Sequence, residues 1–211
     1  LIAIVAARDA AGLKSKDYAR SVVYSSAQAH HSLSKALRIA GLGECIERLV
    51  PHDHRYRMKA EMLEAMIRED RAKSRLPFLV ISSAGTTDTG SVDPNEDIGS
   101  ICESEKLWLH IDAAYGGFFL LCKSGRDIVR GLERSQSVTM DPHKTLFIPY
   151  GSGMVLVRDR SSLRKSHYYF PSYLQDALQA QDELSPADLS PELSKHFRGL
   201  RIWMPLLIHG L

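Results

Sequence analysis

Three polar segments of the sequence each follow a run of apolar, β-rich residues, and each carries side chains that could take part in chemistry. They are Gly85-Thr86-Thr87 after residues 78–83, Asp112 after residues 107–111, and Asp141-Pro142-His143-Lys144 after residues 137–140. Ligands of an open α/β sheet bind beyond the carboxyl ends of its strands. We therefore expect hydroxyl groups, a carboxylate and a lysine amine to surround one ligand.

A lysine and a carboxylate beside one ligand are what pyridoxal phosphate requires. The lysine amine holds the aldehyde of the cofactor as a Schiff base, and the carboxylate keeps the pyridine nitrogen protonated so that the ring accepts electrons. Lys144 and Asp112 have the side chains for these roles, and the imidazole of His30 is a candidate for stacking on the ring. Residue type alone leaves a plainer interpretation open, because an aspartate at a strand end is often a cap or turn residue.

The runs that must position these residues alternate between β-rich and helical patterns. Strands are expected at residues 21–24, 45–50, 78–83, 107–112, 137–140 and 153–157, and helices at residues 1–10, 31–40, 58–67, 96–106 and 127–134. Strands separated by helices indicate β-α-β units. The sequence therefore predicts the α/β class, with a mainly parallel, mixed sheet flanked by helices.

Composition and charge exclude several classes of function. The net charge of +2 and the lack of a long Lys/Arg cluster argue against nucleic-acid binding. No apolar run approaches the roughly 20 residues that a membrane span needs. Three scattered cysteines, outside any metal-ligand spacing, indicate free thiols in a reducing compartment.

Four motifs occur in the order found in group II pyridoxal-dependent decarboxylases, a family that includes the aromatic-amino-acid, histidine and glutamate decarboxylases. They are Tyr24-Ser25-Ser26-Ala27-Gln28-Ala29-His30-His31-Ser32, Gly85-Thr86-Thr87, His110-Ile111-Asp112-Ala113-Ala114-Tyr115-Gly116-Gly117 and Asp141-Pro142-His143-Lys144. The chain resembles this family over nearly its whole length, and four motifs in register are more specific than any one. The resemblance implies the large domain of a fold type I, aspartate-aminotransferase-like enzyme.

The resemblance also implies roles for individual residues around pyridoxal phosphate. Lys144 is expected to form the Schiff base and Asp112 to pair with the pyridine nitrogen. His30 would stack on one face of the ring and Ala114 would pack on the other. Thr87 is expected near the ring hydroxyl or near His30.

Further implied roles lie beside and beyond the lysine. His143 and the residue at position 141 would approach the phosphate, but aromatic decarboxylases typically have Asn where this chain has Asp141. A carboxylate there would repel a phosphate, so Asp141 is expected to face a backbone group or a neighbouring cation. Tyr173, 29 residues after Lys144, matches the loop tyrosine that returns a proton to the substrate α-carbon.

The resemblance implies a division of the chain into three parts. Residues 1–160 would form most of the cofactor-binding large domain without its N-terminal part, residues 161–190 a mobile catalytic loop, and residues 191–211 a helix leading to a truncated C-terminal small domain. Both ends of the chain are apolar, so we interpret it as an internal fragment. The complete protein is expected to be a cytoplasmic homodimer.

The expected activity is decarboxylation of an L-amino acid to the amine and carbon dioxide, with an aromatic substrate ahead of glutamate or another acidic one. One alternative is oxidative deamination to an aldehyde, which relatives without the loop tyrosine tend to perform. More distant alternatives are an aminotransferase or desulfurase and a homologue or fragment without activity. Another is a metal enzyme that would use the i, i+2 pairs in His52-Asp53-His54 and His110-Ile111-Asp112.

Overall fold

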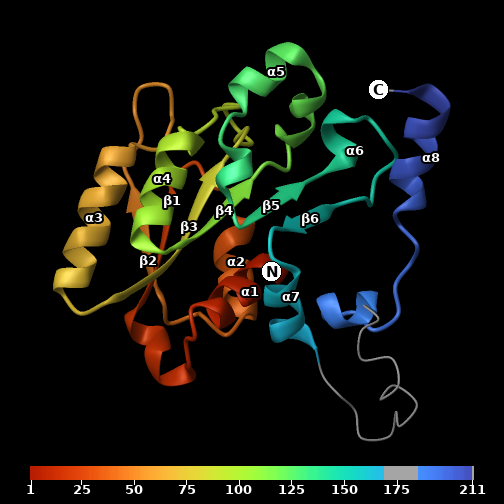
Figure 1. The fold of residues 1–211 in the computed structure, drawn as a ribbon. Coiled ribbons are helices and arrows are strands. Elements are labelled where there is room, and N and C mark those ends of the chain that lie inside the picture. The colour runs from red at the N-terminus through yellow and green to blue at the C-terminus, as the bar shows by residue number, and fades with distance from the viewer. Residues whose placement is uncertain (169–184, 211) are drawn as a thin grey trace, which may run out of the picture.

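The computed structural model describes residues 1–168 and 185–210, and these form a sheet with helices on both faces (Figure 1). The strands are β1 Ser21–Ser26, β2 Ile46–Val50, β3 Leu76–Ser83, β4 Trp108–Asp112, β5 Ser137–Met140 and β6 Met154–Val157. The helices are α1 Ile2–Ala10, α2 Ser32–Ile39, α3 Ala60–Ala72, α4 Asn95–Glu105, α5 Lys123–Ile128, α6 Pro142–Thr145, α7 Arg160–His167 and α8 Leu200–His209.

The six strands pair in the order β2-β1-β3-β4-β5-β6. The strands from β2 to β5 in this order are parallel to one another, whereas β6 pairs antiparallel to β5. The α/β class and the mainly parallel, mixed sheet predicted from the sequence are confirmed. Because neighbouring parallel strands end at the same edge of a sheet, the polar residues after β3, β4 and β5 are brought together.

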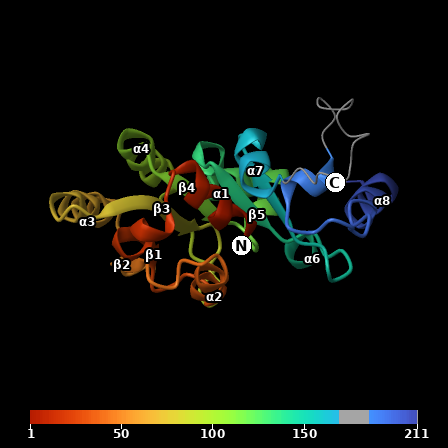
Figure 2. The same ribbon diagram turned by 90° about the horizontal axis from the view of Figure 1, so that it is seen from below.

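The sheet separates two apolar layers. On one face α3 and α4 pack against alternate residues of the strands, including Val80, Leu109 and Ile111. On the other face α1 and α2 cover the intervening positions, such as Leu79 and Ile81. Seen from below in Figure 2, α1 lies across the middle of the sheet, beside α7. Both faces of the central strands are therefore buried, which accounts for their nearly continuous apolar runs.

Two parts of the structure differ from the predicted elements. The helix expected at residues 127–134 is split, because Gly131 adopts φ 88° where its Cα lies against the start of α4, and a Cβ there would come within 2.5 Å of the Asn95 carbonyl carbon. In the predicted loop after residue 160, residues 160–167 form α7. The last helix begins at Leu200, not near residue 192. Residues 191–199 are all exposed, whereas Ile202, Pro205 and Leu206 of α8 are partly covered.

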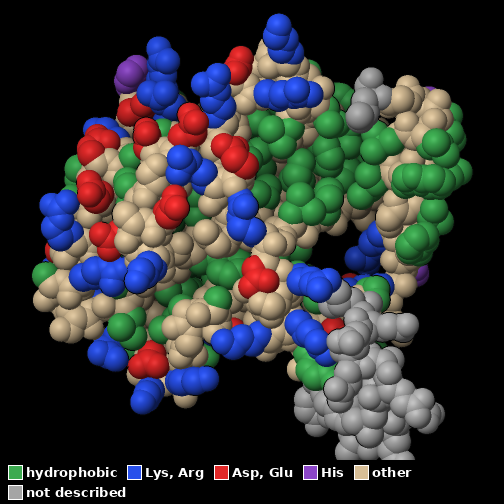
Figure 3. Space-filling view, viewed as in Figure 1, with side chains coloured by type: hydrophobic (Ala, Val, Ile, Leu, Met, Phe, Trp, Pro, Cys, Tyr) green, Lys and Arg blue, Asp and Glu red, His purple; other side chains and the backbone are tan. Residues whose placement is uncertain are grey.

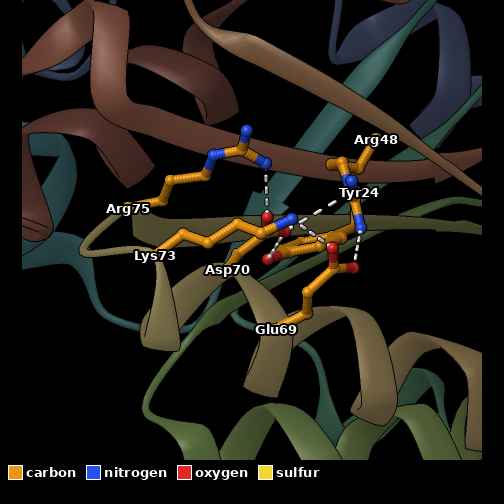
Figure 4. A network of polar contacts seen from close by, with 6 residues as sticks. All are labelled: Tyr24, Arg48, Glu69, Asp70, Lys73 and Arg75. Atoms are coloured by element: carbon orange, nitrogen blue, oxygen red, sulfur yellow. Dashed lines mark hydrogen bonds and ion pairs between the residues drawn. The ribbon is translucent and has the colours of Figure 1, made fainter.

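A buried carboxylate near the C-terminal end of α3 joins this helix to β1 and β2. Asp70 of α3 is fully buried and accepts a hydrogen bond from the Tyr24 hydroxyl at 2.8 Å. Arg75 lies 2.7 Å from its other oxygen, and Arg48 of β2 lies 3.4 Å from the oxygen that Tyr24 contacts. Figure 4 shows these residues with the outer members Glu69 and Lys73. Burial and the bond to Asp70 raise the pKa of the Tyr24 hydroxyl, so Tyr24 acts as a donor.

Replacing Asp70 with Asn should destabilise the fold. The amide keeps the shape but removes the charge that compensates two arginines, and a hydrogen bond to a charged group is worth about 1.5–3 kcal/mol. We expect a loss of that size in the free energy of unfolding of the full-length protein, measured by urea denaturation. Glu64→Gln on the exposed face of α3 is the matched control, and equal stability of the two variants would contradict the role given to Asp70.

Candidate active site

A pocket of about 180 Å³ lies at the carboxyl ends of β3, β4 and β5. Its lining includes five of the six residues predicted to bind the cofactor, namely Lys144, Asp112, His30, Thr87 and Ala114. Strand register explains part of this convergence, because Asp112 pairs with Ser83 on one side and with Thr139 on the other. Both of these neighbours also line the pocket.

Asp112, the last residue of β4, is held by the turn that it begins. Its Oδ1 accepts a hydrogen bond from the backbone N–H of Ala114 at 3.1 Å, which fixes the carboxylate at the strand end. No hydrogen bond to Oδ2 is found within the described residues, so that oxygen is available to a ligand. A fixed, half-buried carboxylate with one free oxygen can hold a proton on a ring nitrogen.

Lys144 lies in the short helix α6 and contacts a second carboxylate. Its Nζ is 3.1 Å from Asp141 Oδ2, and the Lys144 side chain remains 41% exposed. His143 Nε2 lies 3.9 Å from the same oxygen. The neighbouring cation that Asp141 was expected to face is therefore Lys144 itself, and the amine must leave this contact to react with a carbonyl group.

The ring of His30 is oriented by the residue two positions further along the chain. The Oγ of Ser32 lies 2.7 Å from His30 Nδ1, and the Ser32 backbone N–H donates to the same nitrogen at 3.3 Å. Because a backbone N–H can only donate, Nδ1 acts as an acceptor and the imidazole is held beside the pocket. This position is compatible with stacking on a ring, which stays a prediction.

His143 is the predicted binding residue that does not line the pocket. Its Nδ1 is 2.9 Å from the backbone carbonyl oxygen of Ser152, to which it must donate, and its ring lies 4.6 Å from that of Tyr150. This histidine therefore ties α6 to the loop before β6. Its predicted contact with a phosphate is untested, and Tyr173 lies outside the described residues.

Glycine allows the loops around the pocket to approach one another closely. A Cβ at Gly116 would lie 2.2 Å from the carbonyl oxygen of Ala84, and one at Gly85 would lie 3.1 Å from the Gly116 nitrogen. The turn after β3 and the turn after β4 consequently pack backbone to backbone. The pocket between them offers an amine, a carboxylate, an imidazole and hydroxyl groups, a donor set that fits pyridoxal phosphate.

A second cavity of about 620 Å³ adjoins this pocket. It shares His30, Asp112, Thr139 and Asp141 with the smaller pocket and extends over residues 1–4 of the chain. Thr139 lines both cavities, yet the sequence interpretation did not single it out. The signal for it was weak, being only its position two residues before Asp141 in a β-rich run.

The described residues give no support for the metal alternative. They contain no group of three or more His, Cys, Asp or Glu side chains that could hold a metal ion. Asp53, the carboxylate of the first candidate set, is engaged by Arg57 at 2.7 Å. In the described part of the chain, no helix is long and apolar enough to cross a bilayer.

The fold and the pocket together define an α/β protein of the fold type I, pyridoxal-phosphate-dependent class. The family model described as the pyridoxal-dependent decarboxylase conserved domain matches residues 1–211. The chain belongs to that family, whose cofactor is pyridoxal phosphate.

Individual relatives agree with this assignment. Aromatic-L-amino-acid decarboxylase of Bacillus atrophaeus is 35% identical over 100% of this chain and 44% of that protein. Phenylacetaldehyde synthase of Arabidopsis thaliana is 32% identical over 100% of this chain and 44% of that protein. The crystal structure of Oryza sativa TDC with PLP and tryptamine matches with a TM-score of 0.92 and 30% identity, covering 99% of this chain and 44% of that one. The chain thus spans less than half the length of these relatives.

Gly116→Ala should disrupt the packing of the two turns that border the pocket. The added methyl group would overlap the Ala84 carbonyl oxygen, and overpacking of this kind costs about 1–3 kcal/mol. We expect a lower thermal midpoint of the full-length protein, followed by circular dichroism. Gly43→Ala is the control, because the nearest atom to its added Cβ is 3.9 Å away. An unchanged midpoint for Gly116→Ala would show that the turns are not closely packed.

Proposed function

We propose that the complete protein is a pyridoxal-phosphate-dependent carboxy-lyase that converts an L-amino acid to its amine and carbon dioxide. The observation that carries this proposal is the convergence of Lys144, Asp112 and His30 on one pocket in a chain of the decarboxylase family. An aromatic amino acid is the proposed substrate, because the relatives include an aromatic-L-amino-acid decarboxylase and a structure that holds tryptamine.

Each pocket residue has a distinct task in this proposal. When bound, pyridoxal phosphate supplies an electron-accepting ring that stabilises the charge left on the α-carbon as the carboxylate departs. The Lys144 amine would hold the cofactor covalently. The free Oδ2 of Asp112 would keep the pyridine nitrogen protonated, and the His30 imidazole and Ala114 would hold the ring.

Tyr173 distinguishes decarboxylation from its nearest alternative. In the proposal its hydroxyl delivers a proton to the α-carbon, which completes formation of the amine. The alternative is oxidative deamination to an aldehyde, and it is supported by the similarity to a phenylacetaldehyde synthase. The presence of a tyrosine at this position favours the amine as the product.

We further propose that the complete protein is a homodimer in the cytoplasm. Figure 3 shows hydrophobic side chains gathered on the face between α5 and α8. Phe119 and Leu121 before α5, Phe147 after α6, and Trp203 and Leu207 of α8 are exposed. Hydrophobic side chains gathered on one face support burial against another protein surface. The cysteines are free thiols, in keeping with a reducing compartment.

Lys144→Ala tests the cofactor assignment. The full-length variant should lose the visible absorbance of covalently held pyridoxal phosphate and should release no carbon dioxide from aromatic amino acids. Borohydride reduction of the wild type, followed by mass spectrometry of peptides, should place the cofactor on Lys144. Lys16→Ala, at an exposed position away from the pocket, should behave as the wild type. Persistence of the absorbance in Lys144→Ala would make the assignment wrong.

Tyr173→Phe tests the type of reaction. Removing the hydroxyl should lower the rate of amine formation by about 100-fold or more, the range for loss of a general acid. In aerated buffer, where dioxygen is the oxidant and is reduced to hydrogen peroxide, aldehyde, ammonia and hydrogen peroxide should rise at the same time. Amine, aldehyde and peroxide are quantified with one aromatic amino acid, and Tyr168→Phe serves as the control. Aldehyde and peroxide as the main products of the wild type would favour the alternative over decarboxylation.

A further inference from the structure

A row of buried and partly buried polar side chains lies on one face of β4 and β5, next to the pocket. The indole Nε1 of Trp108 donates to Ser137 Oγ at 2.8 Å, and the same oxygen lies 2.8 Å from His110 Nδ1. On the other side of the imidazole, His110 Nε2 lies 3.2 Å from Thr139 Oγ1. The four residues thus form one continuous chain of hydrogen bonds that ends at a residue lining the pocket.

The indole sets the direction of this chain. An indole N–H can only donate, so Ser137 Oγ accepts from Trp108. Within the described residues the Ser137 hydroxyl has no other acceptor than His110 Nδ1. If His110 carried its proton on Nδ1 instead, the buried Ser137 hydroxyl hydrogen would be left without a partner, which is costly. The satisfied arrangement has Ser137 donating to Nδ1.

The hydrogen bond between His110 and Thr139 follows from the protonation state of the imidazole. His110 is buried, and burial lowers its pKa to about 4 despite the neighbouring charge of Asp112, so the ring is neutral near pH 7. With Nδ1 accepting, the single proton lies on Nε2 and is donated to Thr139 Oγ1. The hydroxyl hydrogen of Thr139 is then free to be donated elsewhere.

We propose that Thr139 is a ligand-binding residue of the cofactor pocket, and that Trp108, Ser137 and His110 position its hydroxyl as a hydrogen-bond donor. Thr139 is the register partner of Asp112, and both line the same pocket. A hydroxyl donor at this point can bind an acceptor atom of the ligand. The ligand-binding role of Thr139 rests on the proposed function, whereas the direction of the hydrogen bonds from Trp108 to Thr139 does not.

The direction of these hydrogen bonds can be tested without the cofactor. In the cofactor-free full-length protein labelled with ¹⁵N-histidine, the His110 imidazole should show a protonated Nε2 and an unprotonated Nδ1 near neutral pH. His110→Gln identifies the resonance. Trp108→Phe removes the obligatory donor, so the preference for Nε2–H should weaken. A His110 that is cationic or protonated on Nδ1 in the wild type would overturn the proposed direction.

The binding role is tested with pyridoxal phosphate itself. Thr139→Val keeps the shape but removes the hydroxyl, and we expect the dissociation constant for pyridoxal phosphate to rise about 2- to 10-fold, as for the loss of one hydrogen bond. The absorbance maximum of the bound cofactor should shift as well. Thr139→Ser restores the donor and should restore both values, which a purely structural role for the side chain would not predict.

The outcomes separate this inference from the proposed function. Wild-type affinity and spectrum in Thr139→Val, with Lys144 still carrying the cofactor, would overturn the role of Thr139 and leave the proposed function intact. A wild type that binds no pyridoxal phosphate would contradict the proposed function and the binding role together. The ¹⁵N measurement would still decide the direction of the hydrogen bonds by itself.

Discussion

The parallel register of β3, β4 and β5 is the constraint on which the pocket depends. It sets Asp112 beside Ser83 on one neighbouring strand and beside Thr139 on the other. Successive side chains of a strand point to opposite faces, so a slip of one residue would turn Asp112 toward the α3 and α4 layer. Burial of Leu109 and Ile111 in that layer opposes the slip. The apolar core therefore determines where the reactive groups lie.

Backbone hydrogen bonds continue this order beyond the strand ends. The N–H of Ala84 donates to the Asp112 carbonyl at 2.8 Å, that of Ala113 to Thr139 at 3.0 Å, and that of Asp141 to Ala114 at 3.1 Å. The turns that carry the predicted site residues are thus extensions of the sheet and not free loops. A site whose side chains start from such fixed backbone positions is well suited to chemistry that needs a defined geometry.

The sequence predicted the parts of the structure that local pattern controls. Apolar runs that end in a polar residue placed Asp112 and the Lys144 segment after strands, and the β-α-β units predicted a mainly parallel sheet. Thr139 and the orientation of His143 could not be predicted in this way. Thr139 gains its partner through pairing with a strand about 29 residues away, and His143 is oriented by a carbonyl in the following loop. The start of α8 was missed because side chains become partly covered only within α8, at Ile202, Pro205 and Leu206, which the sequence pattern does not show.

Two carboxylates are compatible in one pocket because their positions give them different partners. Asp112 ends β4, where a turn amide holds one oxygen and leaves the other free. Asp141 precedes α6, whose first turn brings the Lys144 amine within 3.1 Å, and so its charge is compensated. A Cβ at Gly153 would lie 3.0 Å from Asp141 Oδ1, so the absence of a side chain there leaves room for the carboxylate. An asparagine at position 141 would fill the same space but would carry no charge to compensate Lys144. The i, i+3 ion pair therefore depends on the aspartate in this chain.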